Sequence, residues 1–197
     1  MPIFAKKVIY EKVSFSREEE FEKTVIDLAD QIFGTRAIYL DVKKKLKGNN
    51  IGIIPDGFLL DLTIPDEPKL YIVENEIVNH DPFRHIGIQM LKFATSFDEG
   101  RIKLRNLIMK EITKSEIDLK RLEAGCNNSS SRNIDNYLDK AVYADFHGLV
   151  IIDEAKNELF KVLEKINSTI SVLELKAYKS SDGDYAYEFD SLYPNIY

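Results

Sequence analysis

The sequence predicts an α/β fold in which a mixed central sheet is flanked by helices. Residues 53–61 and 70–78 are two runs of β-formers joined by a turn with two prolines, and a helical pattern follows them directly. Further along, a strand at 149–153, a helix at 156–166 and a strand at 170–178 alternate, which is typical of a crossover between parallel strands. The chain has 197 residues, 44% of them hydrophobic, which suffices for one domain with a substantial core.

The first predicted helix runs over residues 16–33. Ser16 and Glu19 have the spacing of a capping box, and Gly34 stands where glycine commonly ends a helix. The apolar arc of this helix contains one carboxylate, that of Glu22. A carboxylate on a buried face needs compensation, so Glu22 either pairs with a lysine or belongs to a functional site.

Residues 36–46 are predicted to form the first core strand, which ends in a lysine cluster. A glycine and two asparagines then turn the chain into the next strand. Lys43, Lys44 and Lys45 could contact a phosphate backbone. Such a cluster also serves as a solvated strand edge that prevents aggregation, and both interpretations stay open.

Acidic side chains interrupt the two apolar strands that follow. Side chains alternate between the faces of a strand, so Glu74 and Glu76 share one face while Asn75 lies on the other. Asp56, on the neighbouring strand, adds a third acid rather than a compensating base, and Asp61 is the alternative to it with the opposite parity. Clustered carboxylates in an apolar setting are unfavourable unless a cation neutralises them. We therefore expect a divalent cation here.

A Pro-Asp dipeptide ending at Asp56, followed by Glu74-Asn75-Glu76 at the end of the next strand, resembles the signature of the PD-(D/E)XK nuclease superfamily. Glu76 stands where the family pattern has lysine, as in the E-x-E variants of some type II restriction endonucleases. The resemblance implies a restriction-endonuclease-like α-β-β-β-α-β core and a nuclease that acts on DNA with Mg²⁺, or with Mn²⁺ as a substitute. It also implies Glu22 as a further carboxylate of the site, because the first helix of this family often contributes one.

Phosphodiester hydrolysis needs an activated water and relief of negative charge on the phosphate and the leaving alkoxide, which carboxylate-bound Mg²⁺ supplies. Asp56 and Glu74 are the expected metal ligands, and the carbonyl of Asn75 and the carboxylate of Glu22 would complete the shell. Glu76 would either bind the water that becomes the nucleophile or hold a second metal.

A further helix is predicted over residues 81–97. Within it, Gln89 and Phe93 resemble the Q-x-x-x-aromatic pattern that follows the active-site strand in some nucleases of this superfamily, where the glutamine orients the site or the substrate. His80 and His85 are five residues apart, which is not the spacing of a helical zinc pair. A role near phosphate or in local capping is therefore favoured over metal ligation.

Residues 101–146 are expected to form a helical insertion. Its first part has seven basic residues against three acidic ones, although the chain has a net charge of −6. A surface that includes Arg101 and Arg105 could face DNA, and such binding would depend on salt. Helices covered with internal charge pairs are an equal alternative.

We expect a single nuclease-like domain spanning residues 1–197 and located in the cytoplasm. No apolar run approaches the ~20 residues that cross a bilayer, so no membrane contact is expected, and the single cysteine, Cys126, has no disulfide partner. Cleavage of both DNA strands at one place would favour a twofold homodimer. Two alternatives stay open: a nuclease fold that no longer cuts but binds nucleic acid or a protein, and an unrelated acidic α/β interaction module.

Overall fold

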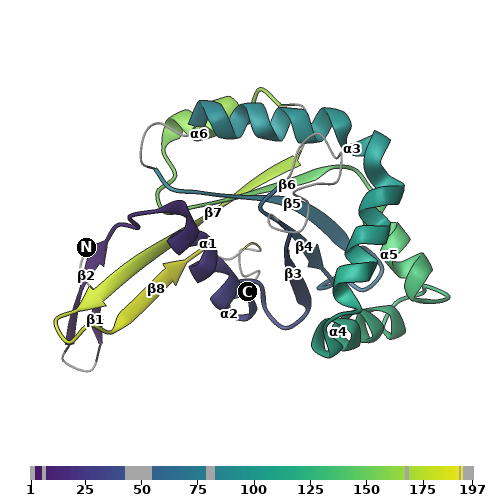
Figure 1. Cartoon of the computed structure of the whole chain (residues 1–197), viewed down its shortest axis with the longest axis horizontal. Coiled ribbons are helices and arrows are strands. Elements are labelled where there is room, and N and C mark those ends of the chain that lie inside the picture. The colour runs from purple at the N-terminus through teal and green to yellow at the C-terminus, as the bar shows by residue number, and fades with distance from the viewer. Residues whose placement is uncertain are drawn as a thin grey trace.

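The computed structural model describes residues 3–5, 8–42, 55–78, 83–166, 169–190 and 192. Its strands form one eight-stranded sheet in the order β1-β2-β7-β6-β5-β4-β3, and β8 pairs with β7. Helices cover both faces of this sheet (Figure 1). The elements are β1 (Ile3–Ala5), β2 (Val8–Val13), α1 (Glu18–Asp27), α2 (Ala29–Phe33), β3 (Ala37–Asp41), β4 (Gly57–Asp61), β5 (Lys69–Glu76), α3 (Phe83–Ile112), α4 (Glu116–Asn127), α5 (Ile134–Val142), β6 (His147–Ile152), α6 (Asn157–Leu163), β7 (Thr169–Ser180) and β8 (Tyr185–Phe189).

The central part of the sheet is mixed, as the sequence predicts. β3, β4 and β5 pair antiparallel, whereas β6 joins β5 and β7 joins β6 in parallel. The chain passes from β5 to β6 through α3, α4 and α5, and from β6 to β7 through α6. The carboxyl ends of β5 and β6 therefore lie side by side at one edge of the sheet, which we call the carboxyl edge.

Two apolar cores hold the helices to the sheet. On the side of α3 and α6, Ile72 of β5 and Met90 of α3 belong to one buried cluster. On the side of α1, Val73 of β5 and Phe21 of α1 belong to the other. Consecutive residues of β5 thus face opposite cores, and burial of this apolar surface contributes roughly 25 cal/mol per Å² to folding.

The first predicted helix is divided in the structure. α1 ends at Asp27 and α2 begins at Ala29, because the chain leaves helical geometry at Leu28 (φ −103°, ψ 7°). The predicted capping box is wrong in its partner: Ser16 donates from its N–H (3.3 Å) and its hydroxyl (3.0 Å) to Glu20, not to Glu19. The helix starts one residue later than the pattern suggests, with Arg17 at the N-cap. Gly34, with φ +79°, ends α2 as expected.

The helix after β5 is longer than predicted. α3 continues through Gly100 to Ile112, so the helix does not end at Phe97 and residues 101–146 begin inside it. We refer to residues 101–146 as the helical region. Its buried residues, including Leu122 and Tyr137, belong to the same core cluster as Ile86 at the start of α3. The helical region therefore shares its core with the rest of the fold.

β7 is twelve residues long and extends beyond the central sheet (Figure 1). Its carboxyl half pairs antiparallel with β2 and with β8, and β1 pairs with β2, which gives a four-stranded arm. β7 and β8 thus form a hairpin, and Gly183 adopts φ +93° in its turn. No helix in the described part of the chain has the length and apolar character needed to cross a membrane.

Candidate functional site at the carboxyl edge of the sheet

Asp56 is held directly against the end of β5. It precedes β4, and its N–H donates to the carbonyl of Val73 at 3.1 Å while its carbonyl accepts from the N–H of Val42 at 3.4 Å. Its carboxylate Oδ2 accepts the backbone N–H of Asn75 at 2.8 Å. The side chain of Asp56 thus takes the place of a strand carbonyl at this point of the ladder. This contact brings the Pro-Asp and Glu-Asn-Glu segments of the sequence together.

The two acids of β5 lie on the α3 side of the sheet. Ile72, two residues earlier, belongs to the α3-side core, so Glu74 and Glu76 continue that face, whereas Asn75 follows Val73 on the α1 side. Glu74 is 2% exposed and Glu76 is 7% exposed. Two carboxylates therefore lie in a row at a position that is almost closed to bulk water.

Glu76 has an unusual electrostatic environment. Burial raises the pKa of its carboxyl group from 4.5 to about 7, and the negative charges of Glu18 and Asp56 contribute in the same direction. His85, whose Nδ1 is 3.4 Å from Oε1 of Glu76, opposes this shift. A pKa of about 7 would leave the carboxyl group of Glu76 in both protonation states near neutral pH, which suits a general acid or base. The sequence indicated no contact between His85 and Glu76.

Tyr39 is a second residue that the sequence did not single out. Its hydroxyl accepts a hydrogen bond from Nδ2 of Asn75 at 2.9 Å. Burial is the main cause that raises the pKa of this hydroxyl, and negative charges that include Asp56 and Glu22 act in the same direction. Tyr39 thus stays protonated. Glu22, on α1, lies on this side of the sheet, opposite the face that carries Glu74.

The expected metal ligands are brought together only in part. In the described ranges, no group of three or more His, Cys, Asp or Glu side chains is arranged to hold a metal ion. Neither Glu22 nor Glu76 therefore completes a group of three ligands with Asp56 and Glu74 in the described ranges. The remaining predicted donors, carboxylates of Asp56 and Glu74 and the carbonyl of Asn75, are oxygen atoms of the kind that Mg²⁺ prefers. Their chemistry fits a hard divalent cation.

Asp61, the alternative to Asp56, belongs to a different part of the fold. It ends β4 opposite Lys69, at the start of β5, whereas Asp56 is bound to the end of β5. Its Oδ1 accepts the N–H of Thr63 at 2.9 Å, which fixes the turn after β4. The structure thus separates Asp61 from Glu74 and Glu76 by the length of the strand.

Gln89 lies one helical turn beyond His85 on α3, so both side chains project to the same side of the helix. Its Oε1 is buried and has no hydrogen-bond partner among the described residues. Because this oxygen is closed to solvent, a contact with substrate would require the side chain to turn outward. The role of Gln89 stays a prediction.

The two arginines predicted to contact DNA have structural contacts. Arg101 donates to the carbonyls of Val142 (3.3 Å) and Ala144 (2.9 Å). Arg105 donates through Nε to Asp139 at 3.0 Å and also pairs with Asp135. Both arginines tie α3 to α5 and to the residues just after it, so their donors already have partners within the protein. The predicted contacts Lys43, Lys44 and Lys45 lie outside the described residues.

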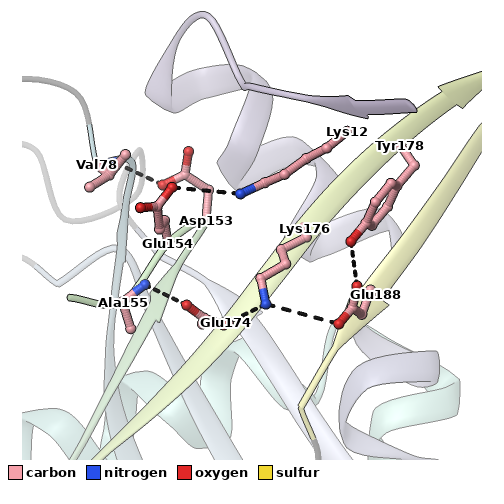
Figure 2. Close-up of polar contacts among 9 residues, drawn as sticks. All are labelled: Lys12, Val78, Asp153, Glu154, Ala155, Glu174, Lys176, Tyr178 and Glu188. Atoms are coloured by element: carbon pink, nitrogen blue, oxygen red, sulfur yellow. Dashed lines mark hydrogen bonds and ion pairs between the residues drawn. The ribbon is translucent and has the colours of Figure 1, made fainter. Parts of the chain in front are cut away.

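The loops that follow β5 and β6 are fastened to each other and to β7 (Figure 2). Asp153, 7% exposed, accepts the N–H of Val78 at 2.7 Å. Glu174 of β7 accepts the N–H of Ala155 at 2.7 Å. Asp153 was not among the site residues predicted from the sequence. It directly follows four apolar strand residues, and the same pattern singled out Glu74. Asp153 therefore fixes the chain just beyond the carboxyl end of β5.

Two lysines next to these loops are used in ion pairs (Figure 2). Lys12 of β2 lies 3.6 Å from Glu154. Lys176 of β7 lies 2.7 Å from Glu174 and 3.9 Å from Glu188. The first pair joins the arm to the carboxyl edge and the others lie along β7 and between β7 and β8, so both lysines already have carboxylate partners.

Asp56, Glu74, Asn75 and Glu76 thus form a buried acidic site at the carboxyl edge, with His85 and Tyr39 on its two sides. Comparisons of the chain with protein-family models, with curated proteins and with solved structures found no match.

Proposed function

We propose that this protein is a metal-dependent nuclease that hydrolyses phosphodiester bonds in DNA. The observation that carries the proposal is the hydrogen bond between the Asp56 carboxylate and the N–H of Asn75, which joins the two halves of the acidic motif at one end of the sheet. The order of elements from α1 to β6, with β3, β4 and β5 antiparallel and β6 parallel to β5, also supports a restriction-endonuclease-like core.

In this proposal, each residue of the site has a role that follows from its position. Asp56 and Glu74 present carboxylate oxygens to a divalent cation, which when bound withdraws charge from the phosphate and lowers the pKa of a water molecule. Glu76, whose pKa lies near 7, accepts the proton of the attacking water. His85 donates toward Glu76 when it is protonated and orients that carboxyl group.

The test is incubation of purified protein with plasmid and with single-stranded DNA in the presence of Mg²⁺ or Mn²⁺. Glu74→Ala and the isosteric Glu74→Gln should lower the rate of cleavage by about 100-fold or more, because a cation cannot be held without this carboxylate. Asp61→Asn is the matched control, because Asp61 is equally buried but lies at the opposite end of β4. It should keep the wild-type rate per folded molecule. Equal loss in both variants would contradict the proposal.

A nuclease fold without catalytic activity is the second candidate. The observation that favours it is that the carboxylates do not form a ready group of three metal ligands in the described ranges. Such a protein would bind DNA without cutting it, and Mg²⁺ would not raise its melting temperature. A functional metal site binds the cation only in the folded state. Millimolar Mg²⁺ or Mn²⁺ should therefore raise the melting temperature of an active wild-type protein but not that of Glu74→Ala.

A further inference from the structure

The basic residues of this protein differ in whether their side chains already pair with acidic or carbonyl groups of the protein. Lys114 lies 2.6 Å from Glu111, Lys120 lies 2.6 Å from Glu116, and Arg121 pairs with Asp30. Together with Arg101 and Arg105, five of the seven basic residues in the first part of the helical region therefore have protein partners. A phosphate could replace these partners only if the existing contacts were broken.

Other basic side chains form no such pairs in the described ranges, and three of them lie on segments outside the helical region. Arg17, Arg84 and Lys156 are exposed, and they form no hydrogen bond or ion pair through their side chains in the part of the chain that the structure describes. Arg17 precedes α1, Arg84 is in the first turn of α3, and Lys156 precedes α6. Three separate segments of the chain thus present a free cation.

Each of these segments reaches the carboxyl edge. Arg17 is the N-cap residue of α1, and this helix packs through Phe21 into the same buried cluster as Ile77, which directly follows β5. His85, next to Arg84, lies 3.4 Å from Glu76. Lys156 follows Ala155, whose N–H donates to Glu174 of β7. Two residues before Ala155, Asp153 accepts the N–H of Val78 just beyond β5. The three cations therefore lie on segments that reach the carboxyl edge, and none of them is in the helical region.

We infer that Arg17, Arg84 and Lys156 are the side chains that hold the phosphate backbone of DNA across the acidic site. The inference rests on the proposed function and deepens it by naming its substrate-binding surface. A site made of buried carboxylates repels a polyanion, so binding needs cations at its rim. Exposed and unpaired cations gain most from a phosphate because they lose no existing partner and release counterions.

The experiment measures binding to a fluorescein-labelled DNA duplex of about 20 base pairs by fluorescence anisotropy, with EDTA present so that nothing is cut. NaCl is varied from about 50 to 200 mM, because the slope of affinity against salt counts phosphate contacts. The variant is the triple change Arg17→Ala, Arg84→Ala and Lys156→Ala. Its slope should fall by about 2 to 3 in log–log units, and its affinity near 100 mM salt should fall at least about tenfold.

The matched control removes the same charge from the other end of α3 and from the loop before α5. Lys103, Lys110 and Arg132 are also exposed and unpaired within the described residues, and Lys103 is about 30 Å along α3 from its first residue. The triple change Lys103→Ala, Lys110→Ala and Arg132→Ala should leave affinity within about twofold of wild type, apart from the shared change in net charge. Circular dichroism verifies that both variants fold.

The outcomes separate this inference from the proposed function. Equal weakening by both triple variants, or weakening by the control alone, would overturn the inference even if wild type cuts DNA. Binding that depends on Arg17, Arg84 and Lys156 in a wild-type protein that never cuts would support the inference and overturn the nuclease activity. Absence of binding to this duplex, while single-stranded DNA or RNA binds through the control residues, would also overturn the inference.

Discussion

The carboxyl edge and the helical region treat buried charge in opposite ways. In the helical region, the buried acid Glu111 is 6% exposed and has the ammonium group of Lys114 at 2.6 Å. At the carboxyl edge, Glu76 is 7% exposed, and its neighbours include the acids Glu18 and Asp56. The buried charge of Glu111 is compensated by a cation three residues away, whereas the charges around Glu76 oppose folding. Residues that lower stability are typical of functional sites, because the activity of the protein requires them.

The largest effect on stability should come from Glu76→Gln. The pKa of Glu76 is raised in the folded protein, so folding takes up a proton between pH 4.5 and about 7, and wild-type stability should fall across that range as pH rises. The full difference is about 3 kcal/mol, reached above pH 7. The variant has no charge to bury at this position, so its unfolding free energy should exceed that of wild type at pH 8, and the difference between the two should shrink as pH falls to 4.5. Urea denaturation at several pH values measures this.

Glu111→Gln is the control for that prediction. It removes an equally buried acid, but one whose partner Lys114 is retained, so we expect destabilisation instead of stabilisation at pH 8. Stabilisation by both changes would mean that the two regions do not differ and that any buried carboxylate in this fold is unfavourable.

A smaller effect is expected for Arg105→Met in the helical region. Methionine keeps much of the apolar stem but loses the contacts that join α3 to Asp135 and Asp139 of α5, and the variant should lose about 1 kcal/mol. A double-mutant cycle with Asp139→Asn isolates the interaction, because the two changes should not add. DNA affinity should stay at the wild-type level. A loss of affinity without a loss of stability would return Arg105 to the substrate-binding surface.

The sequence predicted the strands that carry the site because their apolar alternation and their turn residues are local signals. The end of β5 and the shared face of Glu74 and Glu76 follow from such a pattern. The length of α3 could not be predicted in this way, since a glycine such as Gly100 can either end a helix or be accommodated inside one, as it is here. Whether an isolated glycine ends a helix depends on the packing that continues beyond it.

The partners of charged residues were the least predictable feature. Arg105 and Asp135 are 30 residues apart, and counting charges along the helix suggested a basic surface that the fold largely neutralises. Tyr39 was not predicted for the same reason: its partner Asn75 lies 36 residues away along the chain. Asp56 and Glu74 were found because a known motif, and not their spacing, links them.

The smallest effect is expected for Lys120→Ala, which tests whether burial or mere pairing makes the charges of the helical region stabilising. Lys120 and Glu116 form a pair on α4 with side chains that are 69% and 81% exposed. Solvent screens such a pair, so its loss should change the unfolding free energy by less than about 0.5 kcal/mol, and added salt should remove even that difference. Thermal melts at low salt and at about 0.5 M NaCl measure both quantities. If Lys120→Ala lowered the unfolding free energy as much as Arg105→Met does, exposed pairs would stabilise the helical region as much as buried ones. The contrast between Glu111, which has a lysine partner, and Glu76, which has none among the described residues, could then not be attributed to burial.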